Sequence, residues 1–224
     1  MLRSAFLVAS AMLARSLAAQ PDRGPPPALN GRVEGRTYVS PTGTFRIAVP
    51  VLPELGGFIN DTPNVVTFQD HFNVHVSIGV FAQDATQRWE LSTRGVEDYL
   101  GFFFTNYVMA DFQRLFPGAQ VERAEFSPAI LGGAYITYTL LPGGSMFDDR
   151  RALLRADAAL PVAKRGNLVF VRNGAIFVVS TELAERVIER SGYRKTPEEE
   201  NDILRQRLID LVNKMEFTRP LTSP

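Results

Sequence analysis

The sequence predicts an α+β fold in which helices flank an antiparallel β-sheet. Apolar and polar residues alternate over several short segments, which is the period of half-buried strands. An Asn-Gly pair at residues 173 and 174 joins two such segments, as in a tight hairpin. Two longer segments, 95–116 and 197–215, have the apolar spacing of helices. Because strands and helices do not alternate regularly, we expect antiparallel rather than parallel strands.

The first expected hairpin covers residues 36–50. A Ser-Pro-Thr-Gly turn at residues 40–43 precedes a strand in which Phe45, Ile47 and Val49 are the alternating apolar residues. Residues 51–64 contain prolines and two adjacent glycines, so we expect a surface loop.

A second strand pair is expected at residues 65–69 and 74–81, and it contains the only two histidines of the chain. His75 lies in the second strand and His71 in the turn before it. Four residues of extended chain span about 13 Å, too far for two ligands of one metal unless the turn folds His71 back. We interpret His75 as a solvated or hydrogen-bonded strand residue and His71 as a turn residue, and a metal or general-base role stays open.

The segment 95–116 is expected to be a helix that ends at Pro117-Gly118. It is rich in aromatic residues, including Phe102, Phe103 and Phe104. These rings either pack on the sheet or form an exposed aromatic surface that binds a partner.

The rest of the chain continues the alternation of strands and ends in a helix. We expect strands near residues 120–126 and 134–141, and the Asn-Gly hairpin follows them. The last helix has Thr196 as cap, Pro197 at its first position and Glu199 completing a capping box. The charged segment before it, residues 182–195, is expected to be a short helix with a solvated face.

The loop at residues 142–151 carries the densest group of charged residues. Asp148 and Asp149 could supply oxygen ligands to calcium, and Arg150 and Arg151 could bind a carboxylate or a phosphate. Calcium takes about 6–8 oxygens, so two adjacent aspartates are a weak site. The alternative is a turn in which these charges pair with one another.

The N-terminal segment predicts export. Residues 1–19 have a basic start, a short apolar run and small residues before residue 20, which is typical of a signal peptide. We expect a disordered lead-in at 20–35, one α+β domain at 36–217 and a tail at 218–224, with a periplasmic or extracellular location and no membrane span after cleavage.

Composition excludes several classes of function. The chain has 24 basic and 24 acidic residues, and loss of Arg3 and Arg15 with the leader leaves 22 and 24, a net charge of −2. Nucleic-acid binding normally needs a basic surface, so we expect none. The chain has no cysteine, which rules out disulfides and thiolate metal sites. The motifs Gly-x-Ser-x-Gly, Gly-x-Gly-x-x-Gly and His-Glu-x-x-His are also absent from the sequence.

Four stretches resemble the PsbP-like fold: YVSPTGTFRIAVP, GGAYITYTL, LVFVRNGAIFVVST and the closing helix with NKMEF. This α/β/α sandwich is shared by photosystem extrinsic subunits, a Ran-binding nuclear import factor and bacterial exported proteins. The resemblance implies an accessory or binding protein and transfers no functional residue.

The sequence therefore predicts an exported, non-enzymatic accessory or protein-binding module with a partner in the cell envelope and no cofactor. One alternative is a carrier of small molecules or lipids, which requires an apolar cavity between helix and sheet. Another is an enzyme or metal-dependent protein, which requires the histidines and Asp148 or Asp149 to meet in one pocket. The candidate binding residues are Phe102, Phe103, Phe104, His75, Asp148, Asp149, Arg150 and Arg151.

Overall fold

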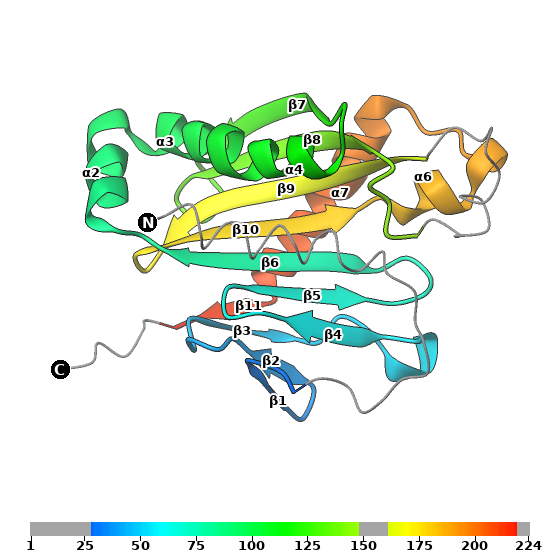
Figure 1. The fold of residues 1–224 in the computed structure, drawn as a ribbon, viewed down its shortest axis with the longest axis horizontal. Coiled ribbons are helices and arrows are strands. Elements are labelled where there is room, and N and C mark those ends of the chain that lie inside the picture. Colours follow the sequence, from blue (N-terminus) through cyan, green and yellow to red (C-terminus); the bar gives the residue numbers. More distant parts are fainter. Residues whose placement is uncertain (1–27, 148–160, 219–224) are drawn as a thin grey trace.

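The computed structural model describes residues 28–147 and 161–218. In these ranges a seven-stranded antiparallel sheet carries helices on one face and a long helix with a four-stranded sheet on the other (Figure 1). In spatial order the large sheet consists of β4 (Phe58–Asp61), β5 (Val65–Gln69), β6 (His75–Ala82), β10 (Ala175–Glu182), β9 (Val162–Arg172), β8 (Ala134–Pro142) and β7 (Gln120–Ser127). The small sheet consists of β1 (Arg32–Glu34), β2 (Thr37–Val39), β3 (Phe45–Ala48) and β11 (Met215–Phe217).

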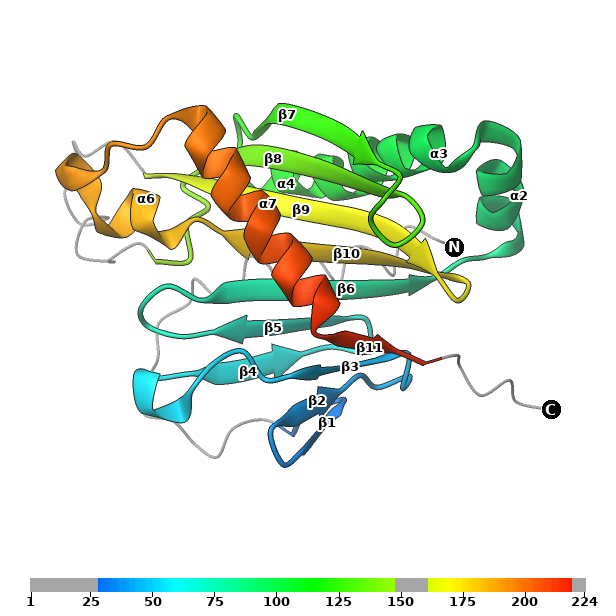
Figure 2. The same cartoon turned by 180° about the vertical axis from the view of Figure 1, so that it is seen from behind.

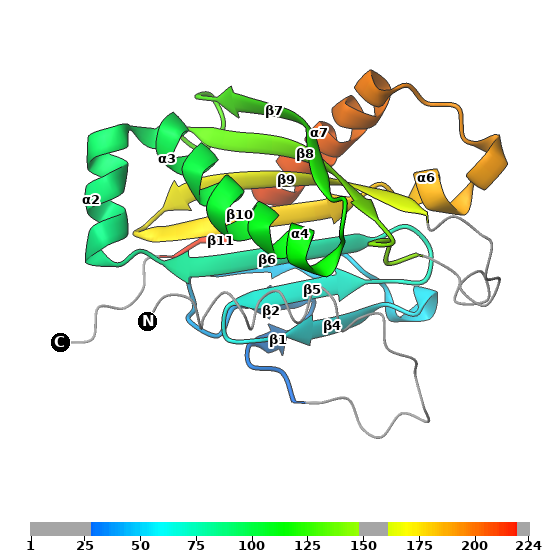
Figure 3. The ribbon, with the colours of Figure 1, turned by 45° about the horizontal axis from the view of Figure 1, so that its top comes forward.

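The helices divide between the two faces of the large sheet. One face carries a continuous helical run over β8 to β10, seen from above in Figure 3. The run consists of α3 (Val96–Phe103), the π-helical η2 (Phe104–Met109) and α4 (Ala110–Leu115), and α2 (Ala85–Arg94) precedes it. On the other face α7 (Pro197–Asn213) crosses the strands obliquely (Figure 2). Short helical turns complete the described chain: η1 (Pro53–Leu55), α6 (Ala184–Ile188) and η3 (Arg190–Gly192).

Capping residues fix where two of these helices begin. Thr196 accepts a hydrogen bond from the Glu199 amide, and the Glu199 carboxylate accepts one from the Thr196 amide, as the sequence predicts. Asp84 and Gln87 form the same reciprocal arrangement at the start of α2. Both arrangements satisfy amides that have no partner inside a helix.

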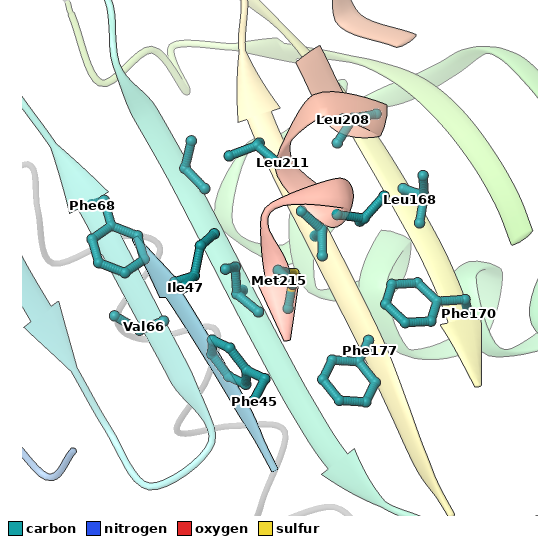
Figure 4. Packing of buried hydrophobic residues seen from close by; sticks show 14 of the residues in the cluster. Phe45, Ile47, Val66, Phe68, Leu168, Phe170, Phe177, Leu208, Leu211 and Met215 are labelled. Atoms are coloured by element: carbon teal, nitrogen blue, oxygen red, sulfur yellow. The ribbon is translucent and has the colours of Figure 1, made fainter. Parts of the chain in front are cut away.

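The larger apolar core lies between the large sheet, α7 and the small sheet. Figure 4 shows Leu208 of α7 near Leu168 of β9, and Phe45 of β3 near Phe177 of β10. The rings of Phe170 and Phe177 stack in parallel with centroids 5.0 Å apart. This core fixes the position of α7 and of the small sheet on one face.

A second apolar core lies on the opposite face, under the helical run. Its buried residues are Tyr99, Leu100, Phe103, Phe104, Met109, Phe112, Phe116, Ala119, Leu141, Ala163, Val169 and Ile176. Both faces of β9 are therefore buried, since successive side chains of a strand point to opposite sides.

The predicted α+β fold is confirmed, with three corrections to its elements. Residues 32–34, which we expected to be disordered, form β1 and pair with β2. The expected loop at 51–64 contains η1 and the strand β4. A ten-residue helix, α2, precedes the aromatic helix and was not predicted. No helix in the described ranges is long and apolar enough to span a membrane.

Candidate functional site

The aromatic segment packs on the sheet, which is one of the two alternatives that the sequence left open. Phe103 and Phe104 are each 1% exposed and lie in the core under the helical run. Phe102 is half-buried, and the guanidinium carbon of Arg94 lies 4.4 Å from the centre of its ring. The expected binding surface is therefore wrong for Phe103 and Phe104, because their rings supply the apolar area that holds the helices on the sheet.

The two histidines lie in different environments. His71 is exposed in the bend between β5 and β6, with its ring against Gly56. His75 is a strand residue, as predicted, but it is 1% exposed and its Nδ1 atom has no hydrogen-bond partner. It is thus neither solvated nor fully hydrogen-bonded.

The remaining candidate ligands give no metal site in the part of the chain that the structure describes. Within that part, no group of three or more histidine, aspartate or glutamate side chains could hold a metal ion. Asp148, Asp149, Arg150 and Arg151 lie outside the described residues.

A row of polar side chains crosses the large sheet on the face that carries the helical run. The strand register places these residues directly opposite one another, from β4 to β8. The first polar row consists of Asn60, Thr67, Ser77, Ser180, Asn167 and Thr137. The sequence alternation had suggested that such residues face water, yet all of them except Asn60 are buried.

Asn167 joins the first polar row into a hydrogen-bonded network. Its side-chain amide donates to the hydroxyls of Thr137 and Thr139, each at 3.2 Å. Its carbonyl oxygen accepts from the Ser180 hydroxyl at 2.8 Å. Because these partners satisfy one another, this part of the row needs nothing from outside the fold.

A second polar row lies two residues further along the same strands. It consists of Gln69, His75, Glu182, Arg165 and Thr139. The segment after β8, Gly143–Phe147, contacts this row and is called the strap below. The strap brings no titratable side chain of its own.

Hydrogen bonds tie the strap to strands that are far apart in the sequence. From β5, the Gln69 side chain donates to the Met146 carbonyl at 3.1 Å. From β10, the Glu182 carboxylate accepts from the Ser145 hydroxyl at 2.7 Å and from the Met146 amide at 3.1 Å. The strap therefore depends on polar side chains, rather than on apolar packing alone, for its place on the sheet.

Arg165 is the least satisfied member of the second polar row. Its Nη2 atom donates to the Gly144 carbonyl at 2.8 Å and lies 3.5 Å from Glu182. Its Nε and Nη1 atoms are buried and have no partner. Among the described residues nine buried side-chain atoms lack a partner, and four of them belong to Arg165, His75 and Gln69. Buried polar atoms are normally paired, so this concentration in neighbouring residues marks the row as a site.

Burial and charge set the protonation of this site. Burial, reinforced by the charge of Arg165, lowers the pKa of His75 well below its usual value, so the imidazole is neutral near pH 7. Burial also raises the pKa of Glu182, against the opposing influence of Arg165 and the strap. Burial lowers the pKa of Arg165, and Glu182 opposes that shift. An arginine stays charged in proteins, so the site holds one buried cation that is only partly paired.

Lys164, the residue before Arg165, shows the opposite arrangement on the other face of β9. It is 0% exposed, like Arg165. Its ammonium group forms ion pairs with Glu122 and with Glu200, the latter at 2.9 Å, and donates to the Pro197 carbonyl at 3.3 Å. Lys164 is thus fully partnered and joins β7, β9 and α7, whereas Arg165 keeps free donors.

An apolar groove of about 500 Å³ lies at the other end of the molecule. It opens between the small sheet and the outer strand β4, not between helix and sheet. Val33, Val49, Val51, Phe58 and Ile59 are among the residues that line it.

Comparison with known proteins shows a likeness of fold only. No family model and no curated protein matches the sequence. The solution structure of cyanobacterial PsbP (CyanoP) from Synechocystis sp. PCC 6803 is similar at 14% identity and a TM-score of 0.49, covering 90% of this chain and 99% of that chain. The Saccharomyces cerevisiae Ran-binding protein Mog1p is similar at 8% identity and a TM-score of 0.49, covering 86% of this chain and 97% of that chain. This likeness agrees with the predicted PsbP-like fold and is taken no further.

Proposed function

We propose that this chain is an exported, non-enzymatic binding module of the cell envelope, and that the second polar row beneath the strap takes part in recognition. The observation that carries the proposal is the group of buried, unpartnered polar atoms in Arg165, His75 and Gln69. Each unpaired buried group costs roughly 1–3 kcal/mol. A ligand or partner that pairs with these atoms would recover that free energy on binding.

The assignment as a binding module follows from how the row is built. The strap uses its backbone and one hydroxyl to engage Gln69, Arg165 and Glu182, so polar contacts hold this cover on the row. His75 is neutral and buried, and among the described residues no hydroxyl is hydrogen-bonded to its Nδ1 atom. A polar surface held by a small number of hydrogen bonds suits reversible recognition.

Thermal denaturation before and after removal of any bound molecule tests this proposal. The protein is purified gently from its own source, and half of it is unfolded in guanidinium chloride, dialysed and refolded. A ligand present at about 100 times its Kd would stabilise the isolated protein by about 2.7 kcal/mol, which raises its Tm by roughly 5–11 °C for a chain of this size. Circular dichroism of the refolded sample controls for misfolding. Equal Tm values for the isolated and the refolded wild-type protein would contradict a tightly bound ligand.

A second candidate function is an apolar carrier, which the groove beside β4 favours. Its volume of about 500 Å³ falls within the usual range of small-molecule sites, about 300–1,000 Å³. The neutral fluorescent probe N-phenyl-1-naphthylamine should then bind with increased emission. Val33 lines the groove and is 41% exposed, so Val33→Asp should abolish the emission without unfolding the protein. Emission that is unchanged by Val33→Asp would place the probe elsewhere.

A further inference from the structure

We propose that the second polar row beneath the strap recognises a carboxylate group, which binds to the free N–H groups of Arg165. This inference rests on the proposed function, because it names the chemistry that the binding module recognises.

The donors of Arg165 point to an acceptor that the described chain does not provide. Nη2 is used by the Gly144 carbonyl, while Nε and Nη1 have no partner and are buried. A guanidinium group pairs most strongly with a carboxylate or a phosphate, since both charge and hydrogen bonds contribute. Arg165 therefore keeps two N–H donors, on Nε and Nη1, that a bound anion can accept from.

Among the described residues, the carboxylate that pairs with Arg165 is shared with the strap. Glu182 lies opposite Arg165 in the strand register, which would suit a close ion pair. Instead its shortest hydrogen bond, 2.7 Å, is to Ser145 of the strap, and its distance to Arg165 Nη2 is 3.5 Å. The strap thus shares the counter-ion of Arg165, and this long ion pair engages only Nη2 and leaves Nε and Nη1 without an acceptor.

Two other members of the second polar row also have buried atoms without a partner. His75 has a free Nδ1 atom and Gln69 has a free Oε1 atom. A neutral imidazole can donate from Nδ1 to a carboxylate oxygen, and the Gln69 oxygen can accept from a hydroxyl or amino group of the same ligand. These atoms come from β5, β6 and β9 of the second polar row, and β10, which carries Glu182, lies between β6 and β9.

Charge balance favours a monoanion over a phosphate. Before binding, the cation of Arg165 offsets the charge of Glu182, and His75 is neutral. An added carboxylate leaves one excess negative charge in a buried site, which is costly. Uptake of one proton by Glu182, whose pKa burial already raises, restores neutrality. A dianionic phosphate would leave a second charge without compensation.

NMR titration with acetate tests the site directly. The probe is the Nε–H signal of Arg165 in a ¹⁵N spectrum of the full mature chain, assigned by its loss in Arg165→Met. The signal should shift saturably with acetate. The Kd for acetate should rise about tenfold per pH unit above the pKa that Glu182 has in the protein without acetate, because binding takes up one proton. Glu182→Gln should bind acetate more tightly at pH 7.5 and lose this pH dependence, since glutamine mimics the protonated acid.

Two further variants keep the test independent of any one substitution. Ser145→Ala removes the shortest hydrogen bond of Glu182, which lets its carboxylate pair more closely with Arg165, and should weaken acetate binding severalfold. Lys164→Met removes the other buried cation of β9 and should leave acetate binding unchanged. A tripeptide and its C-terminal amide separate the two sources of a carboxylate: binding of the free acid alone indicates a peptide end, and binding of acetate and succinate but neither peptide indicates a small acid.

The outcomes separate this inference from the proposed function. A saturable shift in the wild type and in Glu182→Gln, absent in Arg165→Met, supports the carboxylate site. If no carboxylate shifts the signal in either protein, the inference is overturned. In that case a Tm difference between isolated and refolded protein would still support a binding module with another ligand, and equal Tm values would remove both proposals.

Discussion

Two neighbouring substitutions in β9 distinguish a structural cation from a functional one. Lys164 and Arg165 are both 0% exposed and differ in their partners. Lys164 is paired with two glutamates and a carbonyl, whereas Arg165 has buried donors without partners. We therefore expect Lys164→Met to destabilise the fold substantially and Arg165→Met to have a much smaller effect.

The magnitudes follow from the contacts that each substitution removes. Removal of one partner of a buried ion pair typically costs about 3–5 kcal/mol, and Lys164→Met should lie near the lower end because Glu200 keeps Arg186 at 2.7 Å. Arg165→Met also breaks a buried pair, but it relieves two unpartnered nitrogens at roughly 1–3 kcal/mol each. These contributions oppose each other, so its net change should stay within about 2 kcal/mol.

Urea denaturation at pH 7 measures both changes on ligand-free, refolded protein. The midpoint should fall clearly for Lys164→Met and shift little for Arg165→Met, with the same slope m in all three proteins. An equal or larger loss of stability in Arg165→Met would refute the reasoning, because Arg165 would then be a structural residue.

Two further predictions concern the core and the base of α7. Phe103→Ala should cost about 3–5 kcal/mol of stability, since Phe103 is 1% exposed. Phe102 is half-buried, so Phe102→Ala should cost less than half as much. Equal losses of stability in thermal denaturation would contradict the assigned packing. At Glu200, burial alone would raise the pKa, but the hydrogen bond from Lys164 and the charge of Arg186 outweigh it and hold the pKa below 4.5. The stability that Glu200 contributes is therefore present above pH 4.5 and is lost as the pH falls through its folded value. Glu200→Gln should flatten the pH dependence of stability between about pH 5 and 3, and a curve parallel to that of the wild type would argue against this pairing.

Much of the fold could be predicted because local patterns determine it. The Asn-Gly turn, the capping box at Thr196 and the alternation in β5, β6 and β8 each act over a few residues, and the structure contains all of them. The strand β4 was missed because Pro53, Pro63 and the adjacent glycines at 56 and 57 mask a four-residue strand between turn residues. Its existence depends on pairing with β5, which is a tertiary contact.

The polar site could not be predicted for a different reason. His75, Thr137 and Thr139 each stand between apolar or aromatic neighbours, which is equally the pattern of a strand with one face in water. Only the arrangement of helices and strap shows that this second face is buried. The sequence offered only a weak indication of this site. Lys164 and Arg165 are adjacent charged residues beside an apolar run. Successive side chains of a strand point to opposite faces, so the two charges lie on different faces of the sheet. A strand buried on both faces places both charges inside the fold.

Native mass spectrometry of the mature protein, purified gently from its own source, tests the central claim most directly. We predict that the wild type and Lys164→Met carry an additional mass, either a small carboxylic acid or a chain that presents a carboxylate, and that Arg165→Met does not. The bare chain mass in all three proteins, or an additional mass that Arg165→Met retains, would contradict the claim that Arg165 beneath the strap is the recognition site.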